Sequence, residues 1–161
     1  MEVVYEDNHI IIVNKKSGEI VQGDKTGDRP LSDIVKDYIK EKYAKPGAVF
    51  LGVVHRLDRP VSGLVVFART SKALSRLNKM FAEGEVHKTY WAICATEEHV
   101  ADYHPTLLTH WLTRNEQQNK SYAYDHEVPN AKKAQLRYRV LARGERYHIP
   151  DVRTDLAVLG P

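Results

Sequence analysis

Cysteine is almost absent from this sequence, because Cys94 is the only one in 161 residues. A single cysteine excludes a disulfide within the chain and fits a reducing compartment, so we expect a cytoplasmic protein. No apolar run approaches the roughly 18 to 20 residues that span a bilayer. The residues after Met1 are acidic before they are apolar, which is not the order of a secretory signal. We therefore expect no membrane partner.

Recognisable metal and phosphate motifs are missing too. The eight histidines, His99 among them, form no H-E-x-x-H pattern, and the separation of His104 from His110 is not a helical ligand spacing. The stretch QGDKTGD, residues 22–28, lacks the G-K-[ST] end of a phosphate-binding loop. Ser62 lies in no G-x-S-x-G elbow. These absences argue against a metal, a cofactor and a serine hydrolase.

Strong net charge is also lacking, and +3 is too small to indicate a nucleic-acid partner by itself. The basic residues are nevertheless unevenly distributed. The last third of the chain carries a group of them: Lys132, Lys133, Arg137, Arg139, Arg143 and Arg146. Such a group could neutralise phosphates, or it could be the solvated face of a strand. Charge alone leaves both interpretations open.

What the sequence does contain is clear periodicity. Apolar residues between positions 31 and 39 recur at helical spacing, which predicts a helix that Pro46-Gly47 ends. A second helix is predicted over residues 71–85, with Ser71 as its N-cap and Gly84 as its stop. The apolar stripe of this helix is assigned to the core and consists of Leu74, Leu77, Met80 and Phe81.

Strands are predicted from the remaining apolar and alternating segments. An Asp7-Asn8 turn joins the first two of them. The predicted strands cover residues 3–5, 9–13, 49–54, 65–68, 88–95, 107–114, 120–128 and 132–143. Because consecutive strands are separated by short loops, we expect one α+β domain over residues 1–161, with a largely antiparallel mixed sheet and a few flanking helices.

The stretch VHRLDRPVSGLVVFAR, residues 54–69, places charged residues directly beside an apolar strand. Asp58 could simply cap the turn made by Arg59-Pro60, with Arg56 or Arg59 as its surface partner. Alternatively, Asp58 could be a carboxylate nucleophile at the end of a strand, kept ionised by an arginine. The spacing of these residues does not decide between the two.

A resemblance to a known family bears on this choice. The HRLDRPVSGLVVFAR stretch resembles the central motif of the RluA-type pseudouridine synthases, usually H-R-L-D-x-x-T/V-S-G-L-L-L-F-A. VVYEDNHIIIVNKKSG resembles the family's opening, with Lys16 in place of a proline, and KTYWAI is similar to its K-x-Y-x-A segment. AKKAQLRYRVLAR resembles the strand that follows. The resemblance covers roughly residues 2–147.

The end of the chain departs from the family pattern. The family usually continues with T-G-R-x-H-Q-I-R-x-x-L-A-x-L-G-x-P, whereas this chain reads YHIPDVRTDLAVLGP. VRTDLAVLG resembles the I-R-x-x-L-A-x-L-G part, with Arg153 at the position of its arginine. The T-G-R-x-H-Q part is missing, so we expect a chain that is shortened or incomplete at its C-terminus.

The resemblance implies isomerisation of uridine to pseudouridine in rRNA or tRNA, with no cofactor and no metal. It assigns Asp58 as the nucleophile, Tyr90 as the ring that stacks on uracil and takes the C5 proton, and Arg153 as the partner of Asp58. Since the base must leave its stack, RNA contacts are also expected. The residues expected to make them are Arg56, His55, Lys15 and Lys88.

Two other functions remain open on the sequence. One is a non-catalytic RNA-binding module of the same fold, and the other is a carboxylate-dependent hydrolase of small nucleosides. A monomer is favoured as the oligomeric state. An RNA turnover assay separates the enzyme from the binding module, and activity on free uridine alone would indicate the hydrolase.

Overall fold

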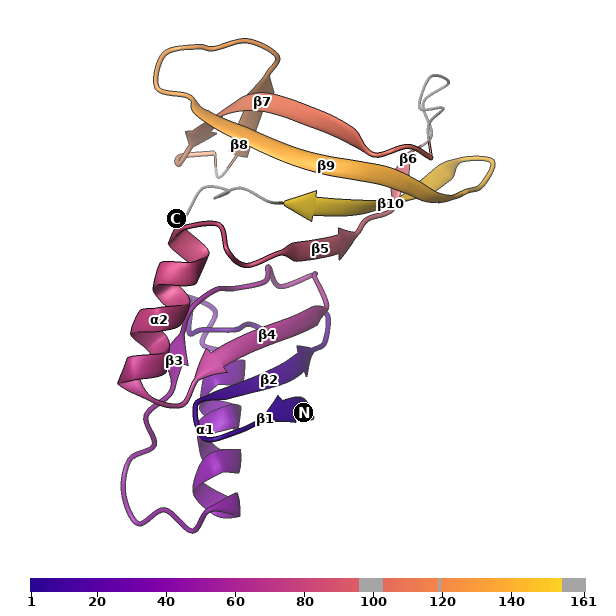
Figure 1. The fold of residues 1–161 in the computed structure, drawn as a ribbon. Coiled ribbons are helices and arrows are strands. Elements are labelled where there is room, and N and C mark those ends of the chain that lie inside the picture. Colours follow the sequence, from indigo (N-terminus) through magenta and orange to yellow (C-terminus); the bar gives the residue numbers. More distant parts are fainter. Residues whose placement is uncertain (96–102, 119, 155–161) are drawn as a thin grey trace. The chain divides into compact units, whose positions relative to one another are not determined.

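The computed structural model describes residues 1–95, 103–118 and 120–154 of the chain. The chain forms two compact units, Met1–Met80 and Phe81–Pro161 (Figure 1). Every strand pair in the described part of the chain is antiparallel, and helices accompany the strands. The α+β class predicted from the sequence is confirmed. That the two units form one domain stays a prediction.

The first unit is built on a four-stranded sheet. Its strands, in spatial order, are β1 (Glu2–Glu6), β2 (Ile10–Lys15), β4 (Gly63–Ala68) and β3 (Gly52–Val53). Strands β2 and β4 pair over their whole length, from Ile10 opposite Ala68 to Lys15 opposite Gly63. The strand predicted over residues 49–54 is much shorter than expected, because only Gly52 and Val53 pair with β4.

The turn between β1 and β2 forms at the predicted position. The carboxylate of Asp7 accepts hydrogen bonds from the backbone N–H groups of His9 and Ile10, at 2.7 and 2.8 Å. The backbone N–H of Asp7 also donates to the carbonyl of Ile10 at 3.1 Å. These bonds lower the pKa of the Asp7 carboxyl, because they favour its charged form. The prediction of a turn at Asp7-Asn8 is confirmed.

Helix α1 (Leu31–Lys42) supplies the apolar face that covers this sheet. Its first N–H groups are satisfied by the preceding loop, since Leu31 and Ser32 donate to the carbonyls of Ile20 and Val21. The helix ends at Lys42 rather than at Pro46-Gly47, and Ala44 takes a positive φ of 46°. The core contains Ile11, Val13, Val21, Leu31, Val35, Ile39, Val65 and Phe67.

A polar network around Glu6 ties α1 to the end of β1. The Glu6 carboxylate accepts hydrogen bonds from Lys42 and Tyr43 at 2.7 Å and from Tyr38 at 3.0 Å, and Arg69 lies 3.1 Å away. Burial acts to raise the pKa of Glu6, but the hydrogen bonds outweigh it and the pKa is lowered. The charged carboxylate is therefore the form that holds helix and sheet together.

Helix α2 (Ser71–Ala82) begins and ends close to the predicted positions. Thr70, not Ser71, caps it: the Thr70 hydroxyl accepts the N–H of Ala73 at 3.1 Å. Gly84 follows its end with a φ of 73°, as a helix stop requires. The predicted core stripe is only partly correct, because Met80 is exposed. Within the described residues, no helix is long and apolar enough to cross a membrane.

The second unit is a six-stranded antiparallel sheet with little apolar burial. Among its described residues, Val140 is the only buried hydrophobic one. Its spatial order is β5-β10-β9-β7-β8, and β6 pairs with β10. The strands are β5 (Lys88–Trp91), β6 (Cys94–Ala95), β7 (Thr106–Asn115), β8 (Lys120–Tyr124), β9 (Lys132–Arg143) and β10 (Tyr147–Thr154).

Strand β10 was not predicted, although it lies in the interior of this sheet (Figure 1). Pro150 argues against an interior strand because proline has no N–H to donate. The structure accommodates it at an irregularity in the β9–β10 register, between Ile149 and Pro150. The Pro150 carbonyl still accepts the N–H of Ala92 at 3.2 Å. The remainder of the family-like ending, residues 155–161, lies outside the described part of the chain.

Candidate active site

The loop that carries Asp58 connects β3 to β4 in the first unit. A turn closes at its centre, where the N–H of Val61 donates to the Asp58 carbonyl at 3.0 Å. Side chains along the loop alternate: Leu57 packs against the core, whereas Arg56 and Asp58 are exposed. The backbone of Asp58 is therefore fixed while its carboxylate faces solvent.

A buried ammonium group lies under this turn. Lys15, the last residue of β2, has no exposed surface. Its Nζ donates to the carbonyls of Asp58, Arg59 and Val61, at 3.0, 3.2 and 2.5 Å, and lies 3.3 Å from that of Lys16. These carbonyl partners compensate a charge that would otherwise be costly to bury. Lys15 thus orients the loop that displays Asp58.

The electrostatic state of Lys15 follows from the same contacts. Burial lowers the pKa of its ammonium below the ordinary value. The nearby carboxylates of Glu19 and Asp58 act in the opposite direction. The prediction that Lys15 contacts RNA stays a prediction, and the structure gives this ammonium a role inside the protein.

Two further contacts hold the loop. The N–H of Gly18 donates to the Arg59 carbonyl at 2.8 Å, and Nε of Arg59 donates back to the Gly18 carbonyl at 3.1 Å. The Arg59 guanidinium forms its ion pair with Asp28. The idea that Arg59 is the surface partner of Asp58 is therefore wrong, because Arg59 points to a different loop.

The His55 side chain accepts a backbone hydrogen bond of β4 at a position where β3 no longer pairs with it. Strand β3 ends at Val53, and beyond it the N–H of Val66 on β4 donates to His55 Nε2 at 3.0 Å. A ring nitrogen that accepts a hydrogen bond carries no proton, so the neutral ring has its proton on Nδ1. His55 thus supports the sheet edge next to the loop, and its contact with RNA stays a prediction.

We expect the substitution Lys15→Met to destabilise the protein. Methionine fills a similar volume but leaves buried carbonyls without a donor, which costs about 1–3 kcal/mol for each such group. The free energy of unfolding, measured in urea, should fall by about 2 kcal/mol or more. Lys16→Met is the matched control, because Lys16 is the exposed neighbour. Equal stability of the two variants would contradict the role given to Lys15.

The other predicted catalytic residues lie in the second unit. Strand β5 pairs with β10 so that Val152 is opposite Tyr90 and Arg153 is opposite Thr89. Because side chains alternate along a strand, Tyr90 and Arg153 lie on opposite faces of this sheet. The resemblance also implies that Arg153 lies beside the ring of Tyr90, and the structure instead places the two side chains on opposite faces. The pairing of Arg153 with Asp58 stays a prediction.

Lys88 shares the face of Tyr90, two residues away on the same strand. Its Nζ lies 6.0 Å from the centroid of the Phe81 ring, at the outer limit of a cation–π contact. The Lys88 side chain is half-buried. A contact between Lys88 and RNA stays a prediction.

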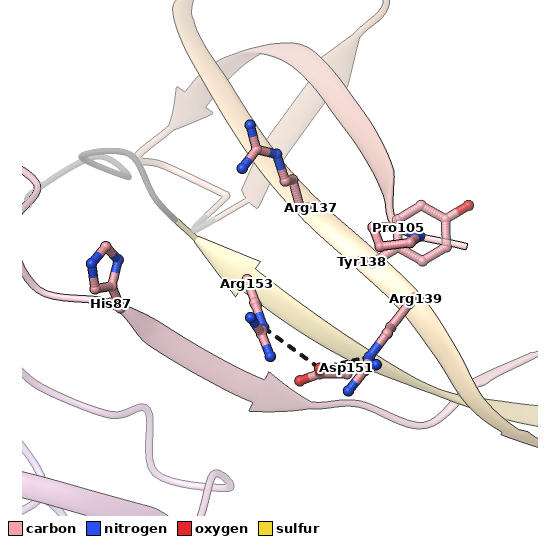
Figure 2. A pocket seen from close by; sticks show the side chains of 7 residues that line it. All are labelled: His87, Pro105, Arg137, Tyr138, Arg139, Asp151 and Arg153. Atoms are coloured by element: carbon pink, nitrogen blue, oxygen red, sulfur yellow. Dashed lines mark hydrogen bonds and ion pairs between the residues drawn. The ribbon is translucent and has the colours of Figure 1, made fainter. Parts of the chain in front are cut away.

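Arg153 belongs to a cavity of about 570 Å³ that the sequence did not predict (Figure 2). Its Nε lies 3.7 Å from Oδ2 of Asp151, and Arg139 donates to the same oxygen at 3.2 Å. The cavity is lined by His87, Pro105, Arg137, Tyr138, Arg139, Asp151 and Arg153. The signal that could have found it is the i, i+2 spacing of Arg137 with Arg139 and of Asp151 with Arg153 on neighbouring strands.

The part of the chain that the structure describes contains no candidate metal site. No three histidine, cysteine, aspartate or glutamate side chains gather there in a way that could hold an ion. His99 lies outside the described residues. The chemistry available at the loop is that of one exposed carboxylate, Asp58, on a fixed turn.

Comparison with known proteins adds sequence relatives. The family model described as RNA pseudouridylate synthase matches residues 9–155. Ribosomal large subunit pseudouridine synthase C of Vibrio cholerae is 30% identical over 148 residues, which are 88% of this chain and 41% of that protein. The mitochondrial pseudouridylate synthase RPUSD4 of Xenopus tropicalis is 36% identical over 96 residues, 58% of this chain and 28% of its own.

A relative named as a tRNA pseudouridine synthase and a solved structure are also similar to this chain. The tRNA pseudouridine synthase C of Vibrio parahaemolyticus is 38% identical over 109 residues, 64% of this chain and 41% of that protein. The structure of human RNA pseudouridylate synthase domain containing 4 has a TM-score of 0.77 at 18% identity, and covers 98% of this chain and 60% of its own. This chain thus spans between 28% and 41% of the curated relatives named here.

Proposed function

This chain belongs to the RNA pseudouridylate synthase family, of the RluA type, and from that membership we propose that it isomerises uridine to pseudouridine within RNA. The bond between ribose C1′ and uracil N1 breaks, the uracil turns, and a bond from C1′ to C5 forms. The proton on C5 leaves and N1 gains one, so nothing is oxidised or reduced. We propose rRNA or tRNA as the substrate, and no cofactor.

The observation that carries this proposal is the fixed turn at Asp58. Its carbonyl is held by the Lys15 ammonium and by the N–H of Val61, while the carboxylate is exposed. An aspartate that attacks C1′ or the uracil ring, or removes a ribose proton, must reach a base that has left its stack. A displayed carboxylate on a rigid support meets that requirement.

The remaining residues receive roles in the same proposal. Tyr90 stacks on the uracil and takes the C5 proton, for which its phenol needs a local environment that favours proton transfer, because an unperturbed pKa is ~10. Arg153 pairs with Asp58. Exposed Arg56, next to Asp58, fills the space of the flipped base or holds a phosphate. His55 and Lys88 are kept as further RNA contacts, whereas Lys15, which has no exposed surface, acts on RNA binding through the loop that it orients. We infer a cytoplasmic monomer.

A second candidate function is a non-catalytic RNA-binding module. The observation in its favour is the register of β5 and β10, which directs Tyr90 and Arg153 to opposite faces. Such a module would keep the basic strand β9 and bind RNA without converting it. A nucleoside hydrolase has no comparable observation in its favour.

Tritium release from RNA tests the proposed function. Transcripts of rRNA and tRNA carrying uridine tritiated at C5 are incubated with the protein, and the tritium in water is counted. The proposal expects release together with a C-linked nucleoside in the digested RNA. Bound RNA without release would favour the binding module. Release of free uracil from uridine alone would indicate the hydrolase instead.

A further inference from the structure

Asp151 lies between two arginines and contacts both of them. It is nearly fully buried on β10, and its Oδ2 accepts a hydrogen bond from Nε of Arg139 at 3.2 Å. The same oxygen lies 3.7 Å from Nε of Arg153 (Figure 2). Oδ1 is buried and has no hydrogen-bond partner among the described residues. The carboxylate therefore acts on both guanidinium groups through their Nε atoms.

The outer edges of these two guanidinium groups are left for another partner. Within the described residues, Arg139 and Arg153 make no other hydrogen bond or ion pair. Their side chains are 48% and 60% exposed, although both line the cavity. Two Nη atoms on each fork can thus donate to a ligand without breaking the contact with Asp151.

The charge of the cavity favours an anion. The guanidinium groups of Arg139 and Arg153 both pair with a single carboxylate of its lining, that of Asp151. A planar guanidinium offers two parallel donors that match phosphate oxygens, and a pair of them can hold one phosphate between them. The volume of about 570 Å³ is more than one phosphate group needs, so the ligand is expected to extend beyond it.

An exposed aromatic ring lies next to these arginines. Trp91 on β5 is directly opposite Asp151 on β10, so the two side chains share a face and are neighbours. Trp91 is 77% exposed, which is unusual for so large an apolar ring. A ring beside a phosphate-binding pair is the arrangement with which proteins bind single-stranded nucleic acid, since bases stack on aromatic side chains.

We propose that this face of the second sheet binds single-stranded RNA next to the target uridine. One backbone phosphodiester accepts hydrogen bonds from the outer Nη atoms of Arg139 and Arg153, and an adjoining base stacks on Trp91. Asp151 is a positioning residue that aims both guanidinium groups. The inference rests on the proposed function in taking RNA as the ligand. It adds Arg139, Asp151 and Trp91, which the proposed chemistry does not use, and at Arg153 it is an alternative to the pairing with Asp58.

Binding of a fluorescent single-stranded oligoribonucleotide to the whole chain, followed by anisotropy at several salt concentrations, tests this site. Arg139→Gln should lower the slope of log affinity against log salt by about 0.7, the value for one lost phosphate contact on a single strand. Trp91→Ala should weaken binding about tenfold and leave the slope unchanged. Arg143→Gln, on the same strand but outside the cavity lining, is the matched control.

Asp151→Asn separates positioning from simple charge. Removal of a negative charge should strengthen RNA binding if Asp151 only contributes to the local potential. Positioning predicts the opposite, a weaker affinity, because the arginines lose their anchor. Circular dichroism identifies a misfolded variant, and in that case the exposed positions Arg139 and Trp91 still decide the question.

Two ligand controls define the anion. An oligonucleotide with a methylphosphonate backbone should bind wild type and Arg139→Gln equally, because it has no charged phosphodiester. Inorganic phosphate at matched ionic strength should not displace the RNA; displacement would indicate a free-phosphate site and overturn the proposal. The proposal would also be overturned if Arg139→Gln or Trp91→Ala bound the RNA with the same affinity as Arg143→Gln.

The same preparation distinguishes this proposal from the proposed function. If tritium is released but Arg139→Gln and Trp91→Ala do not change RNA binding, the proposed enzymatic function is supported and the proposed binding site is rejected. If RNA binding depends on both residues but no tritium is released, the binding site is supported and the proposed enzymatic function is rejected.

Discussion

The substitution Asp58→Asn is expected to abolish formation of pseudouridine. Asparagine keeps the shape of the side chain but cannot act as a carboxylate nucleophile or base. Tritium release from RNA should fall by at least about a thousandfold, which corresponds to ~4 kcal/mol in the activation barrier. Residual activity within about tenfold of wild type, only ~1.4 kcal/mol, would exclude Asp58 as the reacting group.

The geometry of the loop makes this variant informative. Asp58 supports the turn through its backbone carbonyl, which binds Lys15 and Val61, so the amide should leave the fold intact. RNA affinity should be unchanged or slightly higher, since one negative charge is removed. Asp37→Asn is the matched control, because Asp37 is an exposed carboxylate on α1 of the same unit. Loss of stability in Asp58→Asn alone would point to a turn-capping role instead.

Tyr90→Phe should reduce turnover by about a hundredfold to a thousandfold, within the range of general base catalysis. Phenylalanine keeps the ring that stacks on uracil, so RNA affinity should change little. The measurement is single-turnover tritium release together with RNA anisotropy. Turnover equal to wild type would leave Tyr90 only the stacking role.

Tyr138→Phe provides the control for this experiment. Tyr138 on β9 and Tyr90 on β5 are both opposite Val152 of β10, so they flank the same residue on the same face. Both are half-buried. An equal loss of turnover in the two variants would show that removal of either hydroxyl disturbs the sheet, and would contradict a specific role for Tyr90.

The first unit could be predicted well from the sequence because its elements bury continuous or periodic apolar residues. Strand β4 has Val65 and Phe67 fully buried, and α1 follows the helical spacing of its apolar positions. The Asp7 turn was found through the ability of a short carboxylate to accept backbone N–H groups. In each case the local chemistry and the tertiary environment favour the same conformation.

Lys15 could not be placed by residue type alone. A lysine normally indicates exposure, whereas its position continues the alternation of buried Ile11 and Val13 along β2. Period two therefore accounts for the direction of its side chain, whereas residue type does not, and the predicted strand ended at Val13, before this position. The four carbonyls that compensate its charge come largely from a loop more than forty residues away, which no local pattern reveals.

Strand β10 was missed for a related reason. Pro150 within a short segment of mixed polarity normally indicates a loop. Only the long-range register with β9, with its irregularity at this proline, makes the strand possible. The arrangement of Arg139, Asp151 and Arg153 depends on that register, so the i, i+2 spacings could suggest that each pair shares a face but could not by themselves bring the two strands together.

The uneven distribution of apolar burial has a consequence for how the protein should melt. Exposure of apolar surface gives unfolding its heat-capacity change, and nearly all of the buried hydrophobic residues described belong to the first unit. Calorimetry should therefore report mainly on the first unit, whose loop carries Asp58. If the two units unfold separately, damage to the strands that carry Tyr90 and Arg153 leaves most of the calorimetric signal in place, so a normal melting curve would not by itself show that the second sheet of an inactive variant is intact.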